Sequence, residues 1–172
     1  MAKGSGGTRG AKTSALNKFE AAKTKIDKAF EGKDVVNMSD VTGHDLALGA
    51  RIQLNYLDNR SRIQAGTTST ADAFSKIGKD TDISIGNIYS SKDSIDFYKV
   101  ADIISYGSKS DAYGYRLSGD RVILAGGNEY VTAQKVIGKK SVKVKVIDVS
   151  KSDEERYFSS LEKKSVSYKI QL

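Results

Sequence analysis

Residues 141–149 read SVKVKVIDV and carry the clearest pattern in the chain. Val142, Val144 and Val146 alternate with Lys143 and Lys145. Because successive side chains of a β-strand point to opposite faces, this alternation predicts a strand with its valines in a core and its lysines in solvent. A sheet with one well-buried face should therefore organise the fold.

Stretches on both sides of this strand have a similar character, rich in Ile, Val and Tyr and separated by Gly, Asn, Asp and Ser. We predict further strands over residues 83–90, 94–105, 112–118, 121–125, 129–137 and 166–172. Residues 138–140 (Gly-Lys-Lys) predict a tight hairpin turn. The short spacing leaves no room for repeated crossover helices, so we expect a mainly antiparallel, curled sheet or a small barrel.

Residues 45–56 alternate apolar and polar side chains, which favours another strand, although Leu46, Ala50, Leu54 and Leu57 would also form a helical stripe. Residues 68–77 and 153–163 predict short helices.

The N-terminal part has a different periodicity. Apolar residues recur there at spacings of three and four, at Leu16, Phe19, Ala22, Ile26, Ala29 and Phe30. This predicts an amphipathic helix over residues 14–31. We expect an α+β protein: a disordered basic arm over residues 1–12, then one domain over residues 13–172 with a β-rich body over 45–172.

Composition excludes several chemistries. Cysteine is absent from the 172 residues and His44 is the one histidine, which removes disulfides, thiol catalysis, cysteine-ligated zinc and multi-histidine metal sites. His44 and Asp45 are neighbours in sequence, and adjacent side chains on a strand point to opposite faces, so they do not form a catalytic pair. We therefore predict no catalytic residue, no metal and no cofactor. Without a secretory signal or a membrane-spanning stretch, a cytoplasmic protein is expected.

Positive charge is concentrated at the N-terminus. Residues 1–33 hold eight basic and three acidic residues, and the remaining chain holds 20 basic and 18 acidic ones, within a net charge of +7. A basic arm beside a nearly neutral body is typical of proteins that bind nucleic acid or an acidic protein surface. A solvated, solubilising tail is the alternative.

Candidate contact residues fall into three groups: the arm and helix (Lys3, Arg9, Lys12, Lys23), a lysine ladder (Lys135, Lys139, Lys140, Lys143, Lys145) and an aromatic–basic group (Tyr113, Tyr115, Arg116). The ladder suits phosphate contacts, and equally the protection of an exposed edge strand. The tyrosines suit base stacking if exposed, or a core position if buried.

The segments Ile85-Gly86-Asn87-Ile88-Tyr89 and Asp96-Phe97-Tyr98-Lys99-Val100 resemble a stretch of small uncharacterised proteins encoded by phages and plasmids. The resemblance covers about 16 residues and implies a phage or other mobile-element origin. A phage-encoded binding protein would have a host protein, such as a defence component, among its partners.

A second pattern is similar to that of mono-ADP-ribosyltransferases. Arg51 or Arg62 precedes Thr68-Ser69-Thr70, in the order of that family's arginine strand and Ser-Thr-Ser motif. The family's Glu-x-Glu is absent, and Glu129 is the isolated acid that remains. The resemblance implies an NAD-using enzyme. A non-enzymatic binding protein is the leading expectation, with this enzyme or a virion structural component as the alternatives.

Overall fold

The computed structural model describes the backbone of residues 2–33, 36–107 and 111–162, and the side chains of these residues from Ala15 onward. The predicted strand over 166–172 lies outside the described residues. The helices are α1 (Ala2–Ala29), α2 (Met38–Thr42), α3 (Leu48–Ala65), α4 (Thr70–Ile77), α5 (Phe97–Tyr106), α6 (Asn128–Val136) and α7 (Lys151–Tyr157), with short 3-10 turns η1 (Ile85–Asn87) and η2 (Ser118–Asp120). The strands are β1 (Lys79–Ser84), β2 (Ile88–Ser90), β3 (Ala112–Arg116), β4 (Val122–Gly126) and β5 (Ser141–Asp148).

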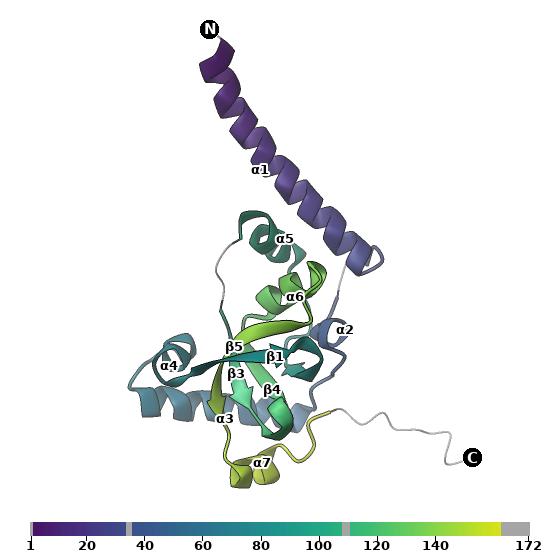
Figure 1. Cartoon of the computed structure of the whole chain (residues 1–172). Coiled ribbons are helices and arrows are strands. Elements are labelled where there is room, and N and C mark those ends of the chain that lie inside the picture. The colour runs from purple at the N-terminus through teal and green to yellow at the C-terminus, as the bar shows by residue number, and fades with distance from the viewer. Residues whose placement is uncertain (1, 34–35, 108–110, 163–172) are drawn as a thin grey trace, which may run out of the picture.

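The strands form one open, curled sheet in the order β1-β5-β3-β4-β2 (Figure 1). The β1–β5 and β3–β4 pairs are antiparallel, and the β2–β4 and β3–β5 pairs are parallel. The predicted α+β class and curled sheet are confirmed. The sheet is mixed, however, and does not close into the barrel that was the other possibility.

Helices cover both faces of the sheet, so the protein has two hydrophobic cores. Val142, Val144 and Val146 point into the first core, together with residues of α1, α5 and α6. Tyr115 and Ile123 point into the second core, against α3 and α4. Val144 is fully buried, which confirms the predicted orientation of the 141–149 strand.

The region predicted as a strand over residues 45–56 is instead the start of α3. The helical stripe is the pattern that the fold uses, since Leu46, Ala50, Leu54 and Leu57 are all buried in the second core. Leu, Arg and Gln are good helix formers, and Gly66 ends the helix in the left-handed region at φ 69°. Alternation failed as a guide because the other apolar residues of this stretch face outward.

Two more predicted strands, over residues 94–105 and 129–137, are the helices α5 and α6. Asp96 caps α5 by accepting from the backbone N–H groups of Tyr98 and Lys99 at 3.0 and 3.3 Å. Gly127, at φ 87°, precedes α6. α5 joins β2 to β3 across β4, and α6 joins β4 to β5 across β3. Because each connection passes over one strand of the sheet, β4 lies parallel to β2 and β3 lies parallel to β5. Residues 138–140 consequently join α6 to β5 and make no hairpin.

The predicted N-terminal amphipathic helix is present as α1, which begins at Ala2 and whose N-terminal part extends beyond the rest of the molecule (Figure 1). Its packed face is the predicted one, since Ala22, Ile26 and Phe30 are buried. Among the described residues, no helix is long and apolar enough to cross a membrane.

Candidate functional site

The C-terminal half of α1 rests on α5, and aromatic rings make the contact. Phe30 stacks on Phe97 with ring centroids 5.8 Å apart, and Phe19 meets Tyr98 at 5.1 Å. Ile26 is buried between these two contacts along the helix. The other half of α1 extends beyond α5 (Figure 1). The aromatic contacts therefore hold a helix whose N-terminal part stands clear of the body.

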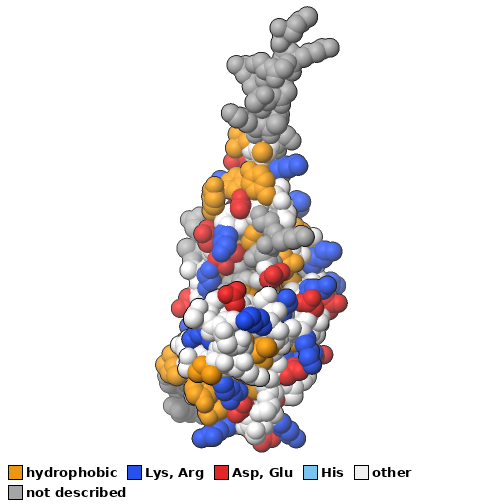
Figure 2. Space-filling view, turned by 90° about the vertical axis from the view of Figure 1, so that its left-hand side faces the viewer, with side chains coloured by type: hydrophobic (Ala, Val, Ile, Leu, Met, Phe, Trp, Pro, Cys, Tyr) orange, Lys and Arg blue, Asp and Glu red, His pale blue; other side chains and the backbone are white. Residues whose placement is uncertain are grey.

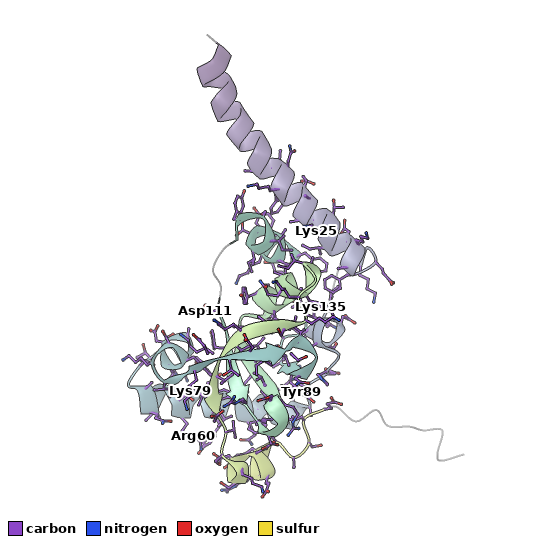
Figure 3. The ribbon with its side chains drawn as sticks, in the orientation of Figure 1. Lys25, Arg60, Lys79, Tyr89, Asp111 and Lys135 are labelled. Atoms are coloured by element: carbon purple, nitrogen blue, oxygen red, sulfur yellow. The ribbon has the colours of Figure 1, made fainter. Side chains whose placement is uncertain are left out.

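Most of the excess positive charge of the chain lies on this helix. The sequence of α1 contains seven basic and two acidic residues, net +5, which leaves +2 for all other residues. Lys18, Lys23, Lys25 and Lys28 are all exposed. Figure 3 labels Lys25 on α1 and Arg60 on α3, toward opposite ends of the molecule. The basic surface is therefore separated from the helices that cover the second core.

Apolar side chains lie beside these lysines. Leu16 is 60% exposed and Tyr98 71% exposed. A hollow of about 160 Å³ lies on the surface between α1 and the start of α5. Its lining includes Phe19, Lys23 and Tyr98. Figure 2 shows hydrophobic side chains gathered in the upper part of the described surface, next to basic ones. A partner of α1 would therefore meet both charge and exposed aromatic surface.

The predicted arm residues Lys3, Arg9 and Lys12 belong to the sequence of α1, but their side chains lie outside the described ones. Their role in binding stays a prediction, and the predicted arm over residues 1–12 falls within the sequence of α1. Lys23 is described and exposed, and its ammonium lies 6.0 Å from the centroid of the Phe19 ring.

The lysine ladder of β5 has a different setting. β5 lies between β1 and β3, so it is not the edge strand that the alternative interpretation required. In the register with β1, Lys143 stands opposite Asp82 and Lys145 opposite Asp80. Opposite charges on facing residues of an antiparallel pair stabilise the sheet and cancel its net charge. The edge strand on this side of the sheet is β1, which carries the exposed Asp80 and Asp82.

The remaining predicted lysines do not extend the ladder. The ammonium of Lys135 donates to the backbone oxygen of Val41, between α6 and α2. Lys139 and Lys140 are exposed in the turn before β5, and the backbone oxygen of Lys140 accepts from the N–H of Ile85 at 2.9 Å. Lys135 is therefore bound to α2, while the other four lysines lie on β5 and in the turn before it.

The aromatic–basic group serves the second core. Tyr115 is buried, and its hydroxyl donates to Asp58 Oδ1 at 2.6 Å. Burial raises the pKa of Tyr115, and burial also raises the pKa of Asp58 despite this hydrogen bond. Tyr113 is half-buried against Phe74, with ring centroids 5.0 Å apart. Base stacking on Tyr115 is therefore excluded in this structure, and Tyr115 is a core residue.

Arg116 is held by acids on the same surface. Its guanidinium donates to Asp148 Oδ1 at 2.7 Å and to Asp148 Oδ2 at 3.2 Å, and lies 3.8 Å from Asp120. These hydrogen bonds raise the pKa of Arg116 and lower that of Asp148. A bidentate carboxylate already satisfies the donors with which an arginine would grip a phosphate.

A cleft of about 630 Å³ opens beside the end of β2. Its polar lining includes His44, Asp45, Arg51, Lys92, Asp93 and Glu162. Each basic side chain meets an acid. Arg51 donates to Asp93 at 2.9 Å and to Asp45 at 3.4 Å, and Lys92 pairs with the buried Glu129. The His44 ring contacts Glu162. Sequence reasoning missed this network because its members come from separate segments of the chain.

The polar groups of the cleft are bonded to one another. Ser90 Oγ donates to the side-chain oxygen of Asn128, so no base among the described residues activates it. His44 stacks on Tyr89 at 4.0 Å, and its second ring nitrogen faces the carbonyl oxygen of Gly86. Burial raises the pKa of Tyr89. Among the described residues, no group of three or more metal-binding side chains occurs.

The residues of the ADP-ribosyltransferase-like pattern do not come together. Arg62 donates to Thr70 Oγ1 at 2.8 Å, and Ser69 caps α4 by accepting from the N–H of Asp72. Both lie with α3 and α4 on one face of the sheet. Glu129 belongs to α6 on the other face, where it pairs with Lys92. Arg62 and Ser69 therefore lie across the sheet from Glu129, whereas Arg51, the alternative arginine, lines the cleft that also includes Lys92, the partner of Glu129.

Comparisons with models of protein families, with curated proteins and with solved structures find no match to this chain.

Proposed function

We propose that this chain is a non-enzymatic binding protein that contacts an acidic partner through α1. The observation that carries the proposal is the separation of charge: net +5 falls on one helix, and part of that helix stands clear of the body. The other predicted basic residues support the same choice, since Lys143, Lys145 and Arg116 all face aspartates. Nucleic acid and an acidic protein surface both match this chemistry.

The decisive measurement is a salt titration of binding to duplex DNA, to RNA and to polyglutamate. Replacing Lys18, Lys23, Lys25 and Lys28 by Gln should weaken binding and flatten its salt dependence. The log–log slope should fall by about 0.9 for each duplex phosphate that the variant no longer neutralises. The matched control replaces Lys139, Lys140, Lys143 and Lys145 by Gln and removes the same charge. Equal weakening in the two variants would refute a contact centred on α1.

The probes separate the two kinds of partner. Binding to DNA or RNA without binding to polyglutamate indicates nucleic acid, and the reverse indicates an acidic protein. No binding to any probe at low salt overturns the proposal. Removal of residues 1–12 tests the arm: unchanged affinity would confine the contact to the part of α1 that follows.

An acidic host protein is the partner expected for a phage-encoded chain. A pull-down from lysate, with and without nuclease, separates such a protein from one that nucleic acid carries along. Disappearance of every captured protein on nuclease treatment would contradict a direct protein partner.

A further inference from the structure

Helix α3 carries apolar side chains on two sides. Its inner side buries Ala50, Leu54 and Leu57 in the second core. Its outer side presents Leu48, Ile52, Tyr56 and Ile63, which are 72, 58, 51 and 73% exposed. At about 100° per residue these four fall within one stripe, roughly opposite the buried side. We name these four residues the outer stripe.

An apolar stripe of this length is unusual on an exposed helix and marks a surface that another segment covers. Tyr56 extends it toward α7, since its ring centroid lies 5.9 Å from that of Tyr157. Arg60 lies over Tyr56 at 5.8 Å and pairs with Asp153, so the charge at this border is already matched. The covering segment should therefore be apolar rather than acidic.

The described chain ends at the beginning of this stripe. Leu46, two residues before α3, forms an antiparallel bridge with Glu162. The N–H of Ala47 donates to the oxygen of Leu161 at 2.7 Å. Leu48 and Glu162 line the same cleft. Glu162, the last described residue, therefore lies beside the start of α3.

Residues 163–172 match the stripe in pattern and in length. Val166, Tyr168, Ile170 and Leu172 are apolar and alternate with polar residues. In an extended segment such residues recur about every 6.7 Å, and the i, i+4 residues of a helix recur about every 6 Å. The outer stripe runs about 22 Å from Leu48 to Ile63, and ten extended residues reach about 33 Å.

We propose that residues 163–172 bind along α3 in an extended conformation, with Val166, Tyr168 and Ile170 covering Leu48, Ile52 and Tyr56. The segment is tethered at Glu162, so its local concentration at the stripe is in the millimolar range. A few apolar contacts then suffice for occupancy, without the association cost that a separate partner meets.

The first test measures how accessible the outer stripe is in the full-length chain. The protein lacks cysteine, so Ile52→Cys introduces a single thiol whose rate of alkylation reports its exposure. Changing Val166, Tyr168, Ile170 and Leu172 to Ser should raise that rate several-fold. The control thiol, Ile137→Cys on the other side of the sheet, should not respond. An unchanged alkylation rate for the Ile52→Cys thiol overturns the proposal, whichever register residues 163–172 would adopt along α3.

The second test distinguishes this segment from a second copy of the chain. The double variant Ile52→Cys/Tyr168→Cys should form an intrachain disulfide on oxidation, in clear excess over Ile52→Cys/Ser167→Cys, whose second thiol points away from the stripe. Equal yields show an undocked segment and overturn the proposal. Disulfide-linked dimers that increase with protein concentration show that a second copy covers the stripe, and also overturn it.

Discussion

The lysines of α1 and those of β5 are alike in the sequence and differ in the fold. Lys18, Lys25 and Lys28 are exposed on a helix that carries a net charge of +5. Lys143 and Lys145 are outward-facing residues of a central strand, and an aspartate of β1 stands opposite each. A basic pattern therefore indicates a binding surface only when the neighbouring strand or helix leaves its charge uncompensated.

The largest effect should come from disrupting the packing of α1 on α5. Ile26 is buried between these helices, so Ile26→Ala removes apolar contacts and leaves a cavity, and should lower the free energy of unfolding by about 2–5 kcal/mol. Denaturant unfolding measures this. Leu16→Ala, at an exposed position of the same helix, should change it by less than about 0.5 kcal/mol. Equal effects would mean that α1 does not pack on α5 as described.

The packing of the β5 lysines can be broken at Gly78. A Cβ at this position would lie 2.4 Å from the backbone oxygen of Phe74 and 2.6 Å from Cγ of Lys145. Gly78→Ala should therefore lower the free energy of unfolding by about 1–3 kcal/mol. Gly49→Ala meets nothing within 4 Å, and inside α3 it should raise stability by about 0.5–1 kcal/mol. Thermal unfolding of the two variants should shift in opposite directions.

Charge reversal tests whether the lysines of β5 pair with the aspartates of β1. Lys143→Glu places a glutamate opposite Asp82 and should lower the free energy of unfolding by about 1 kcal/mol. Lys25→Glu on α1 should change it by less than about 0.5 kcal/mol. Adding Asp82→Lys to Lys143→Glu restores opposite charges and should recover most of the stability. A double variant as unstable as the single one would contradict cross-strand pairing.

The smallest effect concerns pH. The hydrogen bond from Arg116 lowers the pKa of Asp148 below its usual value near 3.9. A carboxyl with a lowered pKa in the folded state stabilises the fold above its unfolded pKa, and this stability is lost as pH falls through the folded pKa. Because Asp148 is half exposed, the contribution should stay below about 1 kcal/mol.

Asp148→Asn should therefore lower stability at neutral pH and flatten the decline below about pH 4. Urea unfolding across this range measures both changes. An unaltered acid slope would show that the Arg116–Asp148 pair contributes nothing to folding.

Several errors in prediction share one cause. In α5, Val100 and Ile103 have the β-branched character of a strand, and the signals for a helix were the Asp96 cap and the left-handed Gly107. In α6 the signal was Gly127 followed by Asn128, which is equally typical of a turn. Tertiary packing overrides β propensity in such short apolar stretches. Because α5 and α6 were predicted as strands, the parallel pairings β2–β4 and β3–β5 were not predicted.

Local sequence patterns were enough to predict the α1 packing face, the β5 strand with its buried valines, and the location of the excess positive charge. These are local properties, set by side-chain periodicity and by composition. The tertiary structure was needed to show which aspartates stand opposite Lys143 and Lys145, that Tyr115 is buried, and that the outer stripe of α3 begins beside Glu162. These properties depend on strand order and helix placement, which bring together residues far apart in the chain and are invisible to any local pattern.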